Sequence, residues 1–117
     1  MDNVFRVISA ADLASARASG LVPRCPSDDR SGHVHLNHRE DVARVATLYF
    51  TPDEAPVALE LRRSDMETAL AFAPASPDKP FRQVALAWPN IPFSSVVQVH
   101  RLQWVLEDGR HRFAMAE

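Results

Sequence analysis

Alternating apolar and polar side chains predict strands along much of the chain. Residues 4–8 are rich in β-branched and aromatic side chains, and residues 57–61 place apolar side chains on one face, as a half-buried strand does. A longer alternation covers residues 94–106, and the turn residues Glu107-Asp108-Gly109 separate it from a last run at 110–115. This arrangement is typical of a β-hairpin, so we expect an antiparallel pair at the end of the chain.

Helical spacing occurs twice in the first half of the chain. Ser9 precedes an alanine-rich segment, residues 10–19, with an acid early and an arginine late, which predicts a capped helix. Apolar side chains recur at helical spacing over residues 38–50. Asn37 is placed as the N-cap of this second helix, with Glu40 three residues later completing a capping box.

Two stretches rich in proline and polar residues separate these elements. Residues 21–31 and 74–80 read as exposed loops, and a short strand is expected after the second loop, over residues 81–87. Residues 64–72 fit both a helical turn and the start of a strand. The order is strand, helix, strand, helix and then mainly strands, which predicts a single α+β domain over residues 1–117.

The short strand expected at residues 33–36 carries the strongest candidate chemistry. Because side chains alternate along a strand, His33 and His35 point to one side, and Val34 and Leu36 point to the other. A strand that runs into a helix brings His35 close to the N–H groups of the first helical turn. Such a place suits an anionic or polar ligand, so the candidate site is centred on His35.

Composition and charge narrow the classes of partner. The chain is 46% hydrophobic with a formal net charge of -2, which is ordinary for a globular protein and does not favour nucleic acid. No stretch approaches the roughly 18 apolar residues of a membrane span, and we expect no signal peptide. A single cysteine, Cys25, indicates a reducing, cytoplasmic setting. Trp104, within the long alternation, marks a candidate surface for a homo-oligomer.

Three stretches together resemble a known family. The opening residues 7–9 with the alanine-rich helix after them, residues 32–42, and residues 57–61 are similar to the small bacterial family catalogued as domain of unknown function 952. The hexapeptide from Gly32 to Asn37 resembles that family's Gly-aromatic-Ile-His-Leu-Ser signature. The family is placed with the ADP-ribosyltransferase-like fold, whose active relatives cradle NAD. The resemblance therefore implies a split mixed or antiparallel sheet with two N-terminal helices and an NAD-type pocket.

The resemblance also implies roles for individual residues. His35 matches the strand histidine expected to contact a ribose hydroxyl, while Asn37 and Gln83 stand where the family has a serine and a second histidine. Arg6, on the first strand, is either a solvated edge charge or a phosphate anchor. Glu107 is the candidate late-strand carboxylate for stabilising an oxocarbenium ion. The candidate catalytic residues are thus His35 and Glu107, and the candidate NAD-binding residues are His35, Asn37, Arg6 and Gln83.

Three functions from different classes stay open. The first is binding of an NAD- or ADP-ribose-type small molecule beside His35, with transfer or hydrolysis at the nicotinamide ribose C1 if the protein is an enzyme. The second is a non-catalytic binding or accessory protein, which Gln83 in place of a histidine favours. The third is a metal-dependent enzyme that uses His33 and His35, with Glu60 or Cys25 as a further ligand.

Overall fold

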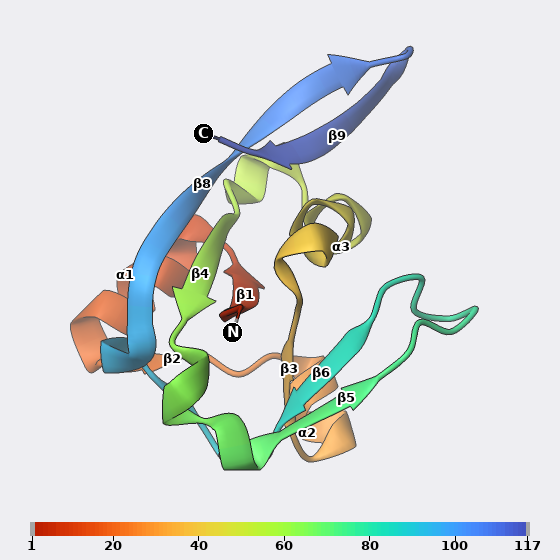
Figure 1. The fold of residues 1–117 in the computed structure, drawn as a ribbon. Coiled ribbons are helices and arrows are strands. Elements are labelled where there is room, and N and C mark those ends of the chain that lie inside the picture. The colour runs from red at the N-terminus through yellow and green to blue at the C-terminus, as the bar shows by residue number, and fades with distance from the viewer. Residues whose placement is uncertain (1, 117) are drawn as a thin grey trace.

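A four-stranded antiparallel sheet in the order β1-β4-β8-β9 runs through the middle of the fold. The computed structural model describes residues 2–116, and these strands confirm those expected from the alternation. Their bounds are β1 (Val4–Ile8), β4 (Val57–Leu61), β8 (Val96–Glu107) and β9 (Arg110–Met115). Because β8 is far longer than β4, the β8–β9 hairpin extends beyond the body of the molecule (Figure 1).

A second sheet lies to one side of the first and contains the strand of His35. It has three antiparallel strands in the order β3-β6-β5, namely β3 (Val34–Leu36), β6 (Gln83–Leu86) and β5 (Leu70–Ala73). An isolated bridge joins the two sheets, with hydrogen bonds of 2.8 and 2.7 Å between the backbones of Phe5 and Asn37. The smallest sheet pairs β2 (Leu21–Val22) with β7 (Ile91–Pro92).

Both expected N-terminal helices are present. Helix α1 (Ala10–Ser19) begins at Ser9, whose hydroxyl accepts a hydrogen bond of 3.1 Å from the Asp12 N–H, and it ends at Gly20 in the left-handed conformation. Helix α3 (Val42–Tyr49) packs its apolar side against β1 and β9. The chain is therefore a small α+β domain with few helices and mostly antiparallel sheets.

The prediction that residues 21–31 form a loop is wrong in part. This stretch holds β2 and a short helix, α2 (Pro26–Ser31). Six residues make fewer than two helical turns, too few to repeat an apolar spacing. The signals at its start are local: a proline in the first turn, and the Asp28 side chain, which accepts a hydrogen bond of 3.1 Å from the Cys25 N–H. The second expected loop, residues 74–80, contains no helix or strand.

The predicted N-cap at Asn37 is also wrong. The Asn37 backbone is engaged in the bridge to Phe5, and the chain continues through a 3₁₀ turn, Arg39–Asp41, before α3 begins at Val42. The capping box with Glu40 does not form because strand pairing holds Asn37 in place. The ambiguous residues 64–72 contain both expected structures, since 3₁₀ turns precede β5.

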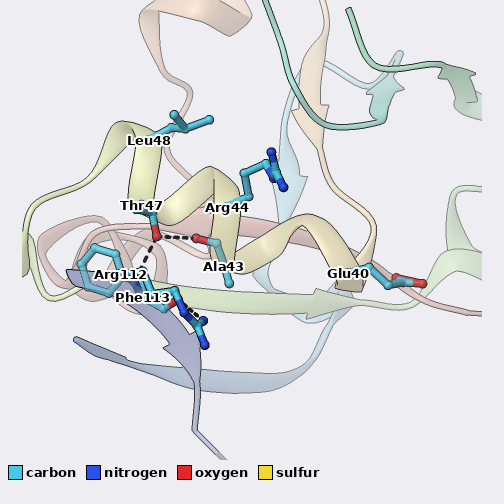
Figure 2. Close-up of a pocket in the computed structure, with 7 residues that line it drawn as sticks. All are labelled: Glu40, Ala43, Arg44, Thr47, Leu48, Arg112 and Phe113. Atoms are coloured by element: carbon cyan, nitrogen blue, oxygen red, sulfur yellow. Dashed lines mark hydrogen bonds between the residues drawn. The ribbon is translucent and has the colours of Figure 1, made fainter. Parts of the chain in front are cut away.

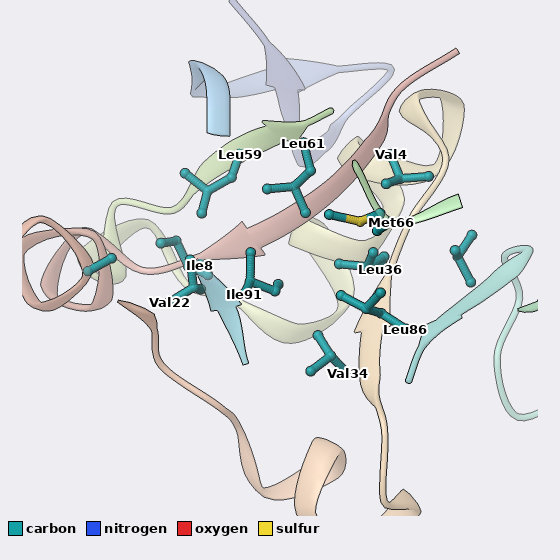
Figure 3. Packing of buried hydrophobic residues seen from close by; sticks show 12 residues of the cluster. Val4, Ile8, Val22, Val34, Leu36, Leu59, Leu61, Met66, Leu86 and Ile91 are labelled. Carbon is teal, nitrogen blue, oxygen red and sulfur yellow. The ribbon is translucent and has the colours of Figure 1, made fainter. Parts of the chain in front are cut away.

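Strand β1 is buried on both faces. Side chains from β1, β3, β4, β6 and β7 make one core cluster, shown in Figure 3, which includes Ile8, Leu36, Leu59, Leu61 and Leu86. A second cluster under α3 takes the alternate side chains of β1, including Phe5 and Val7. Arg6 shares its face with Val4 and Ile8 and so points toward the core. No helix within residues 2–116 is long and apolar enough to cross a membrane.

Candidate functional site

A cavity of about 610 Å³ opens beside His35, and we call it the His35 cavity. Residues of β1, α1, α2, β3, α3 and β6 line it, together with residues of the connecting segments. Its volume falls in the range of small-molecule sites. Its lining residues are Arg6, Val7, Ile8, Asp12, Cys25, Pro26, Ser27, Arg30, His35, Leu36, Asn37, Val45, Tyr49, Phe50, Glu54, Lys79, Phe81, Gln83 and Val84.

His35 is held with one ring nitrogen engaged. Its Nε2 lies 3.3 Å from the backbone oxygen of Ser27 and 3.0 Å from the Ser31 hydroxyl oxygen. Because a carbonyl oxygen only accepts, Nε2 carries the proton in the neutral ring and Nδ1 keeps the lone pair. The His33 ring lies 4.8 Å away between centroids, which confirms that the two imidazoles are on the same side of the strand.

The surroundings of His35 favour its neutral form. Burial lowers the pKa of the imidazole, and the positive charge of Lys79 and the neighbouring His33 lower it further. The Asp28 carboxylate and the Ser27 carbonyl oppose this shift without cancelling it. His35 therefore presents a neutral imidazole at neutral pH, with Nδ1 as a hydrogen-bond acceptor.

Arg6 forms a buried ion pair with Asp28. Its two terminal nitrogens lie 2.7 and 3.2 Å from the two carboxylate oxygens, and Arg6 is only 6% exposed. The same guanidinium donates to the backbone oxygen of His35 at 2.8 Å. The interpretation of Arg6 as a solvated edge charge is therefore wrong. Arg6 lines the cavity, but its charge is already balanced.

Asp28 organises the site, although the sequence patterns did not indicate it. It is completely buried and accepts further hydrogen bonds from the N–H groups of His35 (2.9 Å) and Cys25 (3.1 Å). Burial alone would raise the pKa of Asp28, but Arg6 and these two N–H groups lower it to about 2. The available signal was its position three residues after Cys25 in a capping box.

Two predicted ligand-binding residues line the cavity and carry polar groups without a hydrogen-bond partner among the described residues. Asn37 is 7% exposed, and its side-chain amide makes no hydrogen bond to the described residues. The Nε of Arg6 is buried and also lacks a partner there. Gln83 enters the cavity from β6 and donates to the backbone oxygen of Pro74 at 3.2 Å. The structure thus brings Arg6, Asn37 and Gln83 together around His35.

Other lining residues carried no signal in the sequence. Asp12, Arg30, Glu54 and Lys79 are charged, and Tyr49 and Phe81 contribute aromatic rings whose centroids are 6.2 Å apart. They come from α1, α2, α3, the 3₁₀ turn before β4, and the loop between β5 and β6, which carries both Lys79 and Phe81. Nothing in the spacing of these residues along the chain indicates that they converge.

Glu107 does not join His35. It is exposed at the tip of the β8–β9 hairpin, far from β3, and it pairs with Arg112 at 2.7 Å (Figure 1). The hydrogen bond and charge of Arg112 lower the pKa of this carboxyl. Glu107 does not line the His35 cavity. The predicted pairing of His35 and Glu107 in one catalytic site is therefore corrected.

The metal hypothesis lacks a ligand set. Among residues 2–116, no group of three or more His, Cys, Asp or Glu side chains is arranged to hold a metal ion. Glu60, one of the two further ligands considered, accepts hydrogen bonds from His100 (2.7 Å) and Asn3 (2.8 Å), and Cys25, the other, is a free cysteine that belongs to no such group. The ring of His38 stacks on Phe72. His33 and His35 remain a pair without a third donor.

A second hollow of about 380 Å³ lies where α3 packs on β9 (Figure 2). The Thr47 hydroxyl donates to the backbone oxygen of Ala43 (2.8 Å) and accepts from the Phe113 N–H (3.0 Å). These bonds fasten the helix to the strand. None of the candidate site residues lines this hollow.

Comparison with known proteins shows a shared fold. Three solved structures of protein CC0527 from Caulobacter crescentus are similar to this chain: a crystal structure (19% identity, TM-score 0.73), a crystal structure of a double mutant (20%, 0.73) and a solution NMR structure (22%, 0.71). The alignments cover 93%, 93% and 95% of this chain and 91% of that chain in each case. No protein-family model and no curated protein matches. At this identity the likeness shows the fold alone, a small α+β domain with mostly antiparallel sheets.

Proposed function

We propose that this chain is a cytoplasmic protein that binds a nucleotide-like small molecule, of the NAD or ADP-ribose type, in the His35 cavity. The divided sheet is proposed to be of the ADP-ribosyltransferase-like kind, as the resemblance to the domain of unknown function 952 family implies. One observation carries the binding proposal: a single cavity collects the imidazole of His35, Asn37 and an aromatic pair.

The chemistry of a nucleotide suits this lining. A nucleotide combines a flat ring, ribose hydroxyls and phosphates. Tyr49 and Phe81 offer apolar ring surface, and His35 and Asn37 offer an acceptor and an amide for hydroxyl groups. Cationic side chains at the cavity, Lys79 among them, suit phosphate oxygens. The volume of about 610 Å³ leaves room for a ligand larger than a single ring.

If the protein is an enzyme, the proposed reaction is transfer or hydrolysis at the nicotinamide ribose C1. The non-catalytic alternative has a specific observation in its favour. Glu107, the carboxylate considered for this chemistry, lies at the hairpin tip, and Gln83 stands where the family has a histidine. A neutral glutamine can bind a ligand but cannot take up a proton at neutral pH. We therefore favour binding over catalysis.

The binding test is a proton–nitrogen NMR titration of labelled protein with NAD, ADP-ribose and nicotinamide. We expect NAD and ADP-ribose to shift signals of residues 32–40. His35→Ala should remove these shifts. His111→Ala is the matched control, because His111 stacks on Trp104 in the hairpin and does not line the cavity. Absence of shifts at millimolar ligand would overturn the proposal.

A second measurement separates an enzyme from a binding protein. Protein with bound NAD is incubated, and released nicotinamide is quantified over time. Bound NAD that stays intact supports the non-catalytic alternative. Nicotinamide released by wild-type protein and by His111→Ala, and not by His35→Ala, which is expected to lose binding, would instead establish turnover at the ribose C1.

A further inference from the structure

We propose that the His35 cavity selects a dipolar ligand, with an anionic group held by Arg30 and Lys79 on one side and a cationic group facing Asp12 and Glu54 on the other. This inference deepens the proposed function and rests on it, because it concerns the same cavity and the same class of ligand. It names four residues that neither the sequence patterns nor the family resemblance indicates.

The basic side belongs to the three-stranded sheet. Arg30 lies in α2, just before β3, and Lys79 lies in the loop that leads to β6. Neither forms an ion pair with a carboxylate of the described residues, whereas most of the arginines do, namely Arg6, Arg24, Arg39, Arg62, Arg63, Arg82 and Arg112. Two cations without acidic partners at one cavity leave a positive field for an anion.

The positive charge of Lys79 also acts on His35. Its charge lies close enough to His35 to lower the pKa of the imidazole. An anionic ligand group beside Lys79 would therefore sit next to the neutral ring of His35. The Nδ1 lone pair can then accept a hydrogen bond from a hydroxyl adjacent to that anionic group.

The acidic side belongs to the four-stranded sheet. Asp12 lies in the first turn of α1, directly after β1, and Glu54 lies in a 3₁₀ turn directly before β4. The pairing of Ile8 with Val57 sets the end of β1 beside the start of β4, so the two carboxylates lie at the same end of the sheet. The Asp12 carboxylate has no partner among the described residues, and Glu54 uses one oxygen to accept from the Thr51 N–H at 2.8 Å.

The two sides do not neutralise each other. No ion pair joins Asp12 or Glu54 to Arg30 or Lys79 within the described part of the chain. Arg6 also lines the cavity, and the buried Asp28 already balances its charge. A ligand that bridges the cavity therefore meets opposite charges at its two ends.

Oxidised and reduced NAD provide matched probes of this charge pattern. Both carry the same anionic pyrophosphate, but only the oxidised form has a cationic nicotinamide ring. We expect wild-type protein to bind the oxidised form about tenfold more tightly in calorimetric titrations, because one charge is placed near two carboxylates. The double variant Asp12→Asn, Glu54→Gln should bring the two affinities within about twofold of each other.

Variants of Arg30 and Lys79 test the proposed anion-binding side of the cavity. Lys79→Gln with Arg30→Gln should weaken the binding of both forms of NAD by about tenfold or more and leave the ratio of the two affinities unchanged.

Asp53→Asn is the matched control for the acidic side, since Asp53 is an exposed neighbour of Glu54 that does not line the cavity. Thermal unfolding of each variant verifies that it is folded.

Each outcome supports or overturns a defined statement. Equal affinity of wild-type protein for the two forms, or a preference that survives in the acidic double variant, overturns the dipolar inference while the proposed function stands. If neither form binds, the dipolar inference is overturned, and if ADP-ribose also fails to bind, the proposed function is overturned with it.

Discussion

Asp28 links three elements through one carboxylate. It accepts hydrogen bonds from Arg6 in β1, from the N–H of Cys25 at the start of α2 and from the N–H of His35 in β3. Arg6 in turn donates to the backbone oxygen of His35. The position of His35 is therefore set by a buried ion pair as well as by strand pairing with β6.

Asp28→Asn should be strongly destabilising. It leaves the buried Arg6 charge without its counterion, which costs about 3–5 kcal/mol of the free energy of unfolding. The neighbouring Asp29→Asn breaks an exposed ion pair with Arg24 and should cost less than about 1 kcal/mol. Urea unfolding of both variants measures the difference. Similar losses in the two variants would contradict the role given to Asp28.

The same carboxylate should produce acid sensitivity. The pKa of Asp28 is lowered in the folded state from 3.8 to about 2, so the ionised form stabilises the fold above pH 3.8. This contribution, about 2 kcal/mol, is lost as the pH falls from 3.8 through about 2, because the unfolded state then binds the proton more readily. Direct NMR titration of the carboxyl checks it. A midpoint near 3.8 would contradict the prediction.

His35 should titrate below its ordinary pKa of 6.5, because burial and then Lys79 disfavour its charged form. The folded state therefore binds fewer protons than the unfolded state just below pH 6.5, and this group's contribution to stability falls as the pH drops. NMR titration of the imidazole ring measures the midpoint. Lys79→Gln should move it upward, since one opposing charge is removed. A wild-type midpoint at or above 6.5 would refute the assignment.

Among the elements, length decides which ones the sequence reveals. The β8–β9 hairpin, with twelve and six residues, shows its alternation clearly. Helix α2 has six residues, fewer than two turns, and β2 has two, so neither repeats its pattern often enough to be recognised in the sequence. Helix α2 nevertheless lines the cavity, through Ser27, Arg30 and its N-cap residue Cys25.

The hairpin turn supports a prediction at this scale. Asp108 and Gly109 both have positive φ values, 52° and 76°, as a type I′ turn requires. Nothing lies within 4 Å of a Cβ built at Gly109, so Gly109→Ala costs only backbone strain, about 1 kcal/mol by thermal unfolding. Asp108→Asn should be nearly neutral, because asparagine tolerates this conformation. A neutral Gly109→Ala would argue against this turn.

At the scale of the whole molecule, two leucines on the same sheet should behave oppositely. Leu59 is completely buried in the core cluster, and Leu106 is 64% exposed on the hairpin. Leu59→Ala should lower the free energy of unfolding by about 2–5 kcal/mol, through lost burial and the cavity left behind. Leu106→Ala should change it by less than about 0.5 kcal/mol. Equal effects would mean that the hairpin is covered by another chain.

Self-association stays a prediction. Trp104 is 43% exposed on the hairpin, where its ring stacks on His111 and packs against Phe113. These intramolecular contacts cover part of the Trp104 side chain, and the exposed Leu106 adds further apolar surface on the same hairpin. Sedimentation of wild-type protein and Trp104→Ala would decide whether copies of the chain meet there.

The sequence by itself determined the α+β class, the positions of β1, α1, α3, β4 and the terminal hairpin, and the shared side of His33 and His35. These follow from periodicity and capping, which are local in the chain. Tertiary structure decided that Arg6 is buried against Asp28, that Asn37 bridges to Phe5 and does not cap a helix, and that Glu107 lies away from His35. It also gathered the residues of the His35 cavity. Contacts between distant elements depend on how the sheets pack, and local pattern carries no record of that.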